Sequence, residues 1–143
     1  MGNAALHSRI LVLGIDGAGK TTFIQKVENP DKTPATSPTE AYQVHDIKIK
    51  GVKFNVWDVA GKESTRSLWK HYFQEGGTDA IIWVVDSASS EEKLTESKQC
   101  LSSAMMDPAL SGNYLIVLIW SRFNFQFGAF SKKKKHLEVF FFF

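Results

Sequence analysis

Gly14-Ile15-Asp16-Gly17-Ala18-Gly19-Lys20-Thr21 is the stretch that decides the fold, and it fits the phosphate-loop pattern G-x-x-x-x-G-K-[ST]. The short apolar run at 9–13 before it is typical of a buried strand, and residues 22–27 after it can start a helix. The glycines allow backbone amides to converge on an anion, and the positive end of the helix adds to that field. Strand, glycine-rich loop and helix together therefore predict a phosphate-binding site.

Polar residues in and after this stretch suggest a metal–phosphate centre. We expect Lys20 to reach the β- and γ-phosphates of a nucleotide and the Thr21 hydroxyl to ligate Mg²⁺. Asp58 ends a later predicted strand, where a Mg²⁺ ligand belongs beside a phosphate loop. Gly61 would let a backbone amide approach a terminal phosphate. Taken alone, Asp58 could simply cap the segment that follows its strand.

Composition narrows the class of protein. A chain of 143 residues is expected to form one domain, and its formal net charge of +2 gives no reason to expect a nucleic-acid partner. The single cysteine, Cys100, rules out an internal disulfide framework. No run approaches the roughly 20 apolar residues of a membrane helix, and the N-terminus lacks the pattern of a secretory signal.

Hydrophobic patterning predicts alternating strands and helices. Residues 44–50 and 52–58 alternate as a hairpin, 64–75 and 89–106 suit helices, and 79–86 and 114–120 are strand-like apolar runs. This order predicts an α/β fold: a three-layer phosphate-loop NTPase with a mostly parallel sheet. The phosphate loop would then lie at the carboxyl edge of the first strand, where ligands of such sheets bind.

Several motifs give the chain a family resemblance. The phosphate loop, Pro38-Thr39 and the stretches 56–59, 66–74 and 84–87 resemble the ADP-ribosylation-factor group of small GTPases in the Ras superfamily. The likeness covers about 9–118. The combination of Trp-Asp-Val at 57–59 with Leu-Trp-x-His-Tyr-Phe at 68–73 is far more specific than the phosphate loop alone.

The resemblance implies a set of functional residues. GTP or GDP would be held by Asp16, Gly17, Ala18, Gly19, Lys20, Thr21, Thr22 and Gly61, and Mg²⁺ by Thr21, Thr39 and Asp58, the last through water. Effector proteins would meet an aromatic patch of Tyr42, Trp57 and Tyr72, although core packing alone could explain these rings. Exchange factors are the other protein partners implied, and the switch loops would be released when the γ-phosphate is lost.

Three departures from the family pattern change these expectations. Lys62 stands where the family has the Gln that orients the attacking water, so we expect impaired hydrolysis. Residues 3–8 are too few for the family's amphipathic N-terminal helix. After Leu118 the guanine-reading Asn-Lys-x-Asp is replaced by Trp-Ser-Arg-Phe at 120–123, and the last strand and helices have no counterpart. The strand at 114–119 would then be an exposed edge.

We therefore predict three segments: a short N-terminal segment 1–8, an incomplete GTPase domain 9–119, and a divergent tail 120–143 that is disordered. The lysine and phenylalanine runs of the tail suit either a membrane-surface segment or the translation of non-coding sequence. Gly2 is a candidate for N-myristoylation, although Leu6 departs from the motif, and one acyl chain would give only weak membrane association.

The predicted function is that of an ARF-like switch. It would recruit effectors in a GTP- or GDP-dependent way during vesicle or membrane traffic. It would act in the cytoplasm or peripherally on Golgi or other intracellular membranes. Two alternatives stay open at this point: a partner-binding module without a nucleotide cycle, and a truncated product that does not fold stably.

Overall fold

The computed structural model describes residues 7–31, 33, 38–75, 77–120, 127–133 and 136–142. These residues form one seven-stranded sheet of order β2-β3-β1-β4-β5-β6-β7. The strands are β1 (His7–Leu13), β2 (Tyr42–Ile49), β3 (Val52–Val59), β4 (Thr78–Asp86), β5 (Tyr114–Trp120), β6 (Phe127–Lys133) and β7 (His136–Phe142). The helices are α1 (Lys20–Glu28), α2 (Trp69–Gln74) and α3 (Glu91–Met105), with 3₁₀ segments η1 (Glu63–Leu68) and η2 (Pro108–Leu110).

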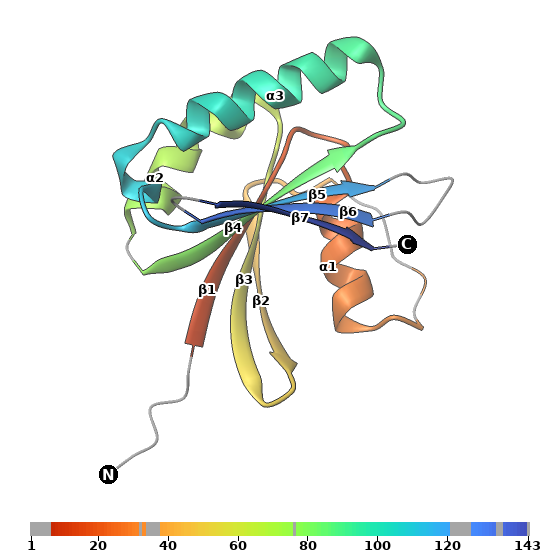
Figure 1. Ribbon diagram of the computed structural model, residues 1–143, viewed down its shortest axis with the longest axis vertical. Coiled ribbons are helices and arrows are strands. Elements are labelled where there is room, and N and C mark those ends of the chain that lie inside the picture. Colours follow the sequence, from red (N-terminus) through yellow and green to blue (C-terminus); the bar gives the residue numbers. More distant parts are fainter. Residues whose placement is uncertain are drawn as a thin grey trace.

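The sheet is parallel at its centre and antiparallel at both sides. β1 pairs in parallel with β3 and β4, and β4 pairs in parallel with β5. β2 is antiparallel to β3, so the predicted hairpin is confirmed. Helices α2 and α3 lie on one face and α1 on the other (Figure 1), which confirms the three-layer α/β architecture.

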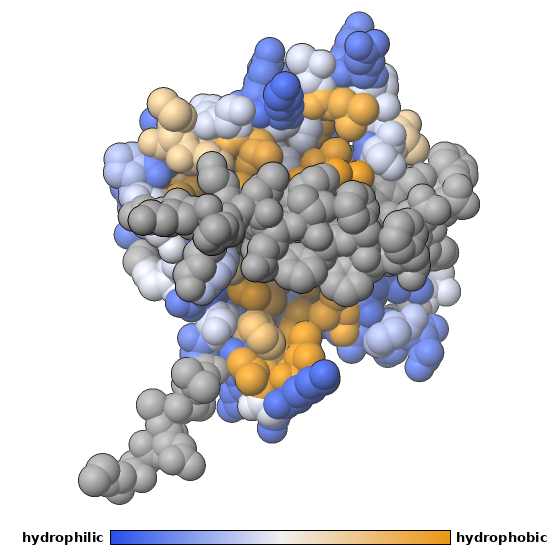
Figure 2. Space-filling view, viewed as in Figure 1, coloured by the Kyte–Doolittle hydropathy of each residue, from blue (hydrophilic) through white to orange (hydrophobic). Residues whose placement is uncertain are grey.

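Two apolar clusters hold the layers together, and β1 contributes alternate residues to each. Leu11 and Leu13 pack with Trp69 and Trp83 in the cluster on the side of α2 and α3. Val12 belongs to the opposite cluster, on the side of α1. Polar side chains lie along the outer surface of α3 at the top of Figure 2, so this helix buries one side and exposes the other. None of the described helices is long and apolar enough to cross a membrane.

The predicted helix at 64–75 is only half α-helical. Residues 63–68 form the 3₁₀ segment η1, and the α-helix begins at Trp69. The Thr65 hydroxyl donates to the Lys62 carbonyl oxygen at 2.9 Å, and the Thr65 amide donates to the same oxygen. Such local bonds from Ser and Thr compete with the α-helical ladder. By contrast, the strand 79–86 and the helix ending before Asp107 are confirmed as β4 and α3.

The tail differs most from expectation. Residues 127–133 and 136–142, predicted to be disordered, form β6 and β7, and β6 pairs antiparallel with β5. Consequently β5 is an interior strand, and the prediction of an exposed edge there was wrong. Aromatic residues favour strands, and the tail is rich in phenylalanine. The composition that suggested non-coding sequence is therefore also strand-forming.

Candidate nucleotide-binding site

The phosphate loop connects the end of β1 to the start of α1, as predicted. Gly19 caps the helix with φ of 95°, a left-handed conformation that favours glycine. A pocket of about 360 Å³ opens beside the loop. It is lined by Asp16, Gly17, Gly19, Lys20, Thr21, Thr22, Pro38, Thr39, Ala60, Gly61 and Lys62. Sequence-predicted residues from three separate stretches therefore meet around one cavity.

Lys20 is buried at the bottom of this site. Its Nζ donates to the carbonyl oxygens of Gly14 at 3.0 Å and Ile15 at 2.9 Å. Burial lowers the pKa of Lys20 from 10.5 to about 8, although the nearby carboxylates of Asp58 and Asp16 oppose this shift. An anion bound next to Nζ would stabilise its charged form. The geometry thus suits Lys20 to bind phosphate.

Thr21, Thr39 and Asp58 converge at the carboxyl edge of the sheet. The Thr21 hydroxyl donates to Asp58 Oδ2 at 2.5 Å and lies 3.0 Å from the Thr39 hydroxyl, which is 3.4 Å from the same carboxylate oxygen. Asp58 is fully buried, and its Oδ1 has no hydrogen-bond partner among the described residues. Oxygen ligands of this kind suit Mg²⁺, and the orphaned oxygen can hold a metal-bound water. These residues therefore fit the metal predicted for them.

Gly61 lies against the phosphate loop. A Cβ at this position would collide with the Gly14 carbonyl oxygen and would come within 2.5 Å of Lys20 Nζ. The Asp16 amide donates to the Gly61 carbonyl oxygen at 3.1 Å. Only glycine permits this approach, so the backbone at Gly61 lies directly beside the phosphate loop and Lys20.

The other predicted residues of the site occupy different environments. Lys62 is exposed at the rim of the pocket, and Thr22 is half-buried beside it. Ala18 does not line the pocket: its side chain packs into the apolar cluster on the α1 side, so only its backbone is available to a ligand. Gly2 lies outside the described residues.

The three aromatic residues predicted to meet effectors form one cluster. Tyr42 stacks on Trp57 with ring centroids 5.0 Å apart, and Tyr72 meets Tyr42 edge-on at 5.4 Å. The Arg9 guanidinium lies over the Trp57 ring at 4.5 Å. Tyr42 is 47% exposed whereas Tyr72 is 8% exposed, so Tyr42 is accessible to a partner and Tyr72 is buried.

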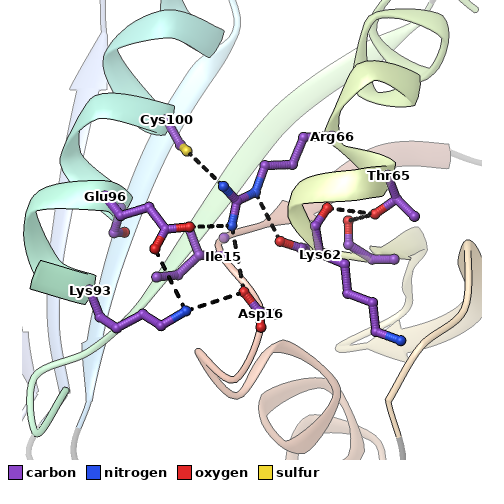
Figure 3. Close-up of polar contacts among 12 residues, drawn as sticks. Ile15, Asp16, Lys62, Thr65, Arg66, Lys93, Glu96 and Cys100 are labelled. Carbon is purple, nitrogen blue, oxygen red and sulfur yellow. Dashed lines mark hydrogen bonds and ion pairs between the residues drawn. The ribbon is translucent and has the colours of Figure 1, made fainter. Parts of the chain in front are cut away.

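Arg66 was missed by the sequence analysis. Its guanidinium contacts Asp16 of the phosphate loop, the Gly61 carbonyl and Glu96 of α3 (Figure 3). Asp16 and Gly61 were predicted for the site, and Arg66 begins the family-like stretch 66–74. On α3 the sequence signal is the i,i+3 spacing of Lys93 and Glu96. Nothing in that spacing indicates that the pair lies next to the phosphate loop.

A phosphate loop at the carboxyl edge of a mostly parallel sheet, with two hydroxyls and a carboxylate converging beside it, defines a phosphate-loop nucleotide-binding fold. Comparison with known proteins narrows this class. The sequence profile of the ADP-ribosylation factor family matches residues 1–134. ADP-ribosylation factor-like protein 1 of Caenorhabditis elegans is 40% identical over 114 residues, covering 80% of this chain and 61% of that protein.

ADP-ribosylation factor-like protein alp41 of Schizosaccharomyces pombe is 37% identical over 110 residues, covering 77% of this chain and 57% of that protein. Among solved structures, the Arl6 BBS3 small GTPase of Trypanosoma brucei, bound to the nucleotide analogue GppNp, superposes with a TM-score of 0.65 at 28% identity. That match covers 79% of this chain and 65% of the other. The chain belongs to the ADP-ribosylation factor family of small GTPases, as its sequence indicated. It spans 57–61% of the length of these two relatives.

Proposed function

We propose that this chain is a guanine-nucleotide switch in which the phosphate loop and the Thr21–Thr39–Asp58 cluster hold the phosphates together with Mg²⁺. The observation that carries the proposal is the convergence of two hydroxyls on one buried carboxylate whose second oxygen has no partner among the described residues. A buried, unpartnered oxygen of this kind is costly unless a ligand or water satisfies it. A hydrated metal ion would do so.

Each residue of the site has a defined task in this proposal. The backbone amides after Gly14 bind the phosphates, and Lys20 neutralises their charge from below. Thr21 and Thr39 would hold the metal through their hydroxyl oxygens, and Asp58 would act on it through water. Mg²⁺, when bound, would offset negative charge on the phosphates.

Nucleotide state would be read through two segments. Thr39 lies in the segment before β2, and Gly61 follows β3, so both are joined to the hairpin that carries Tyr42 and Trp57. Loss of the γ-phosphate would remove the contact that each of these segments makes with the nucleotide or its metal. The exposed part of the aromatic cluster would then present a different surface to effector proteins, and this is how the nucleotide becomes a binding signal.

Hydrolysis is expected to be slow. Lys62 lies at the pocket rim, where the family's Gln would orient water, and an ammonium group has no acceptor with which to do so. The protein would therefore remain in its triphosphate state until an activator acts.

From its family we also propose a role in vesicle or membrane traffic, in the cytoplasm or at Golgi or other intracellular membranes. Gly2, if acylated, would supply a weak membrane anchor.

The proposal is tested by removing the buried cation. Lys20→Ala should abolish most nucleotide affinity, measured by titrating the full chain with a fluorescent guanine nucleotide, because the phosphates lose a cation held inside the pocket. Lys26→Ala on the same helix is the matched control, since Lys26 lies in the last turn of α1 and does not line the pocket. Equal affinity in Lys20→Ala and the parent would rule out this site.

A further inference from the structure

Arg66 joins three parts of the molecule, and the proposed function makes no use of it. As Figure 3 shows, its guanidinium lies between the phosphate loop, the segment after β3 and helix α3. Its Nε donates to the Gly61 carbonyl oxygen at 3.0 Å, and one Nη donates to Glu96 Oε1 at 2.7 Å. The same Nη lies 3.5 Å from Asp16 Oδ1, and the other Nη donates to Cys100 Sγ at 3.5 Å.

The bond to Gly61 is one of several that fix the backbone at the rim of the pocket, and the Asp16 amide donates to the same carbonyl at 3.1 Å. Each carbonyl of residues 60–62 accepts a bond from a side chain further along the chain: Trp69 to Ala60 at 3.0 Å, Arg66 to Gly61 at 3.0 Å, and Thr65 to Lys62 at 2.9 Å. Of these three side chains, Arg66 is the one whose polar contacts extend to the phosphate loop and to α3. It can therefore transmit a change in α3 to the pocket.

The pair of Arg66 and Glu96 has the properties of a fixed contact. The Arg66 side chain is 15% exposed and that of Glu96 is 34% exposed, so both are partly withdrawn from water. The hydrogen bond from Arg66 is the main reason that the pKa of Glu96 is lowered, which means that the carboxylate stays charged. A charged, planar guanidinium bonded on both sides holds its partners in one geometry. Lys93 adds a second cation, 3.7 Å from Asp16 and 3.6 Å from Glu96.

We propose that Arg66, held by Glu96, is a positioning residue that orients the Gly61–Lys62 peptide toward the terminal phosphate of the nucleotide. The inference rests on the proposed function of the pocket. Because a peptide group is planar, fixing the Gly61 carbonyl also fixes the amide of Lys62 and the direction in which Lys62 leaves the backbone. Helix α3 thereby takes part in distinguishing triphosphate from diphosphate, although α3 contributes no residue to the pocket lining.

The test measures the affinity for a non-hydrolysable GTP analogue divided by the affinity for GDP. Both affinities come from fluorescent titration of the full chain. Glu96→Gln keeps the shape of the side chain but removes its charge, and it should lower this ratio about fivefold, since bonds to charged groups are the stronger ones. Arg66→Lys keeps the charge but loses the guanidinium fork, in which separate nitrogens bond Gly61 and Glu96, and it should lower the ratio at least as much. The double variant should be no worse than the worse single variant, because the two residues act as one unit.

Glu92→Gln is the matched control, an exposed residue one turn earlier on α3 that loses the same charge. It should leave the ratio unchanged. A purely structural role for the pair would weaken both nucleotides equally, so an unchanged ratio in Glu96→Gln would overturn the inference while leaving the proposed function intact. Failure of the parent to bind either nucleotide would overturn both. If Arg66→Lys does not fold, the ratio measured for Glu96→Gln decides between these outcomes, because this isosteric change lies in a partly exposed side chain.

Discussion

Lys20 and Asp58 place opposite charges in the same buried edge of the sheet. Lys20 is 7% exposed and Asp58 is fully buried. Burying an unpaired charge at either position would cost a large desolvation free energy. Attraction to Asp58 partly offsets the desolvation of Lys20, but burial remains the larger effect on its pKa. Because Asp58 offsets only part of the cost of burying the Lys20 charge, the site is suited to an anion that offsets the rest.

The lowered pKa of Lys20 makes binding pH-dependent. Burial lowers the pKa of Lys20 to about 8, whereas phosphate binding needs the charged form. In magnesium-free buffer containing a chelator, nucleotide affinity should therefore fall as the pH rises above about 8, by up to about tenfold per pH unit. Titrations between pH 7.5 and 9.5 measure this. Lys20→Arg keeps its charge over that range, and an equally steep fall in this variant would show that another group titrates.

Lys62 is expected to set the rate of GTP hydrolysis. Lys62→Gln supplies an acceptor that can orient water, so single-turnover GTP hydrolysis should become faster, by about tenfold or more given the importance of water positioning in this chemistry. Lys70→Gln, exposed on α2, changes the same charge away from the pocket and serves as the control. No change on Lys62→Gln would mean that Lys62 does not approach the γ-phosphate or that another residue positions the water.

At the scale of elements, α3 is fixed to the sheet by a polar contact inside an apolar cluster. Trp83 of β4 is fully buried, and its Nε1 donates to the hydroxyl of Ser97 at 3.1 Å. Ser97 itself is 3% exposed. This bond fixes the register of α3 over the sheet, and with it the place of Glu96, the next residue toward the N-terminus of the helix. The network around Arg66 therefore depends on how α3 is seated.

Removal of this contact should cost stability. Ser97→Ala leaves the indole N–H of Trp83 buried without its partner, which should lower the free energy of unfolding by about 1–3 kcal/mol. Urea denaturation followed by tryptophan fluorescence measures the change. Ser103→Ala on the exposed side of α3 should stay within about 0.5 kcal/mol of the parent. Equal effects of the two substitutions would mean that the Ser97 hydroxyl contributes nothing specific.

For the whole molecule, sequence reasoning succeeded where the pattern is local and failed where contacts are distant. The phosphate-loop motif with its flanking runs at 9–13 and 22–27 predicted a strand, a loop and a helix, and the alternation at 44–58 predicted the hairpin. Each of these signals lies within a few neighbouring residues. Arg66 and Glu96 are 30 residues apart, and no periodicity connects them. In the tail, composition suggested disorder, whereas pairing with the open side of β5 gives the same residues a strand conformation.

Base preference is a property of the whole chain, because the guanine-reading motif would come from the segment after β5. Phe123 stands near the position of the family's Asp and cannot accept hydrogen bonds from guanine. Each hydrogen bond to guanine that is lost removes roughly 1–3 kcal/mol from the discrimination between GTP and ATP. We therefore expect GTP to be preferred over ATP by less than about tenfold. Competition of unlabelled GTP and ATP against a fluorescent nucleotide measures this. A preference of several orders of magnitude would mean that other residues of the chain read the base.

The most direct test of the central claim is calorimetric titration of the full chain with a non-hydrolysable GTP analogue, with Mg²⁺ and again with a chelator. If Thr21, Thr39 and Asp58 hold the metal beside the phosphates, one nucleotide should bind per chain, and affinity should fall at least about tenfold without Mg²⁺. Asp58→Asn should remove most of this metal dependence while leaving the chelator value nearly unchanged. Binding that is equally tight with and without Mg²⁺, or no binding in either condition, would contradict the account.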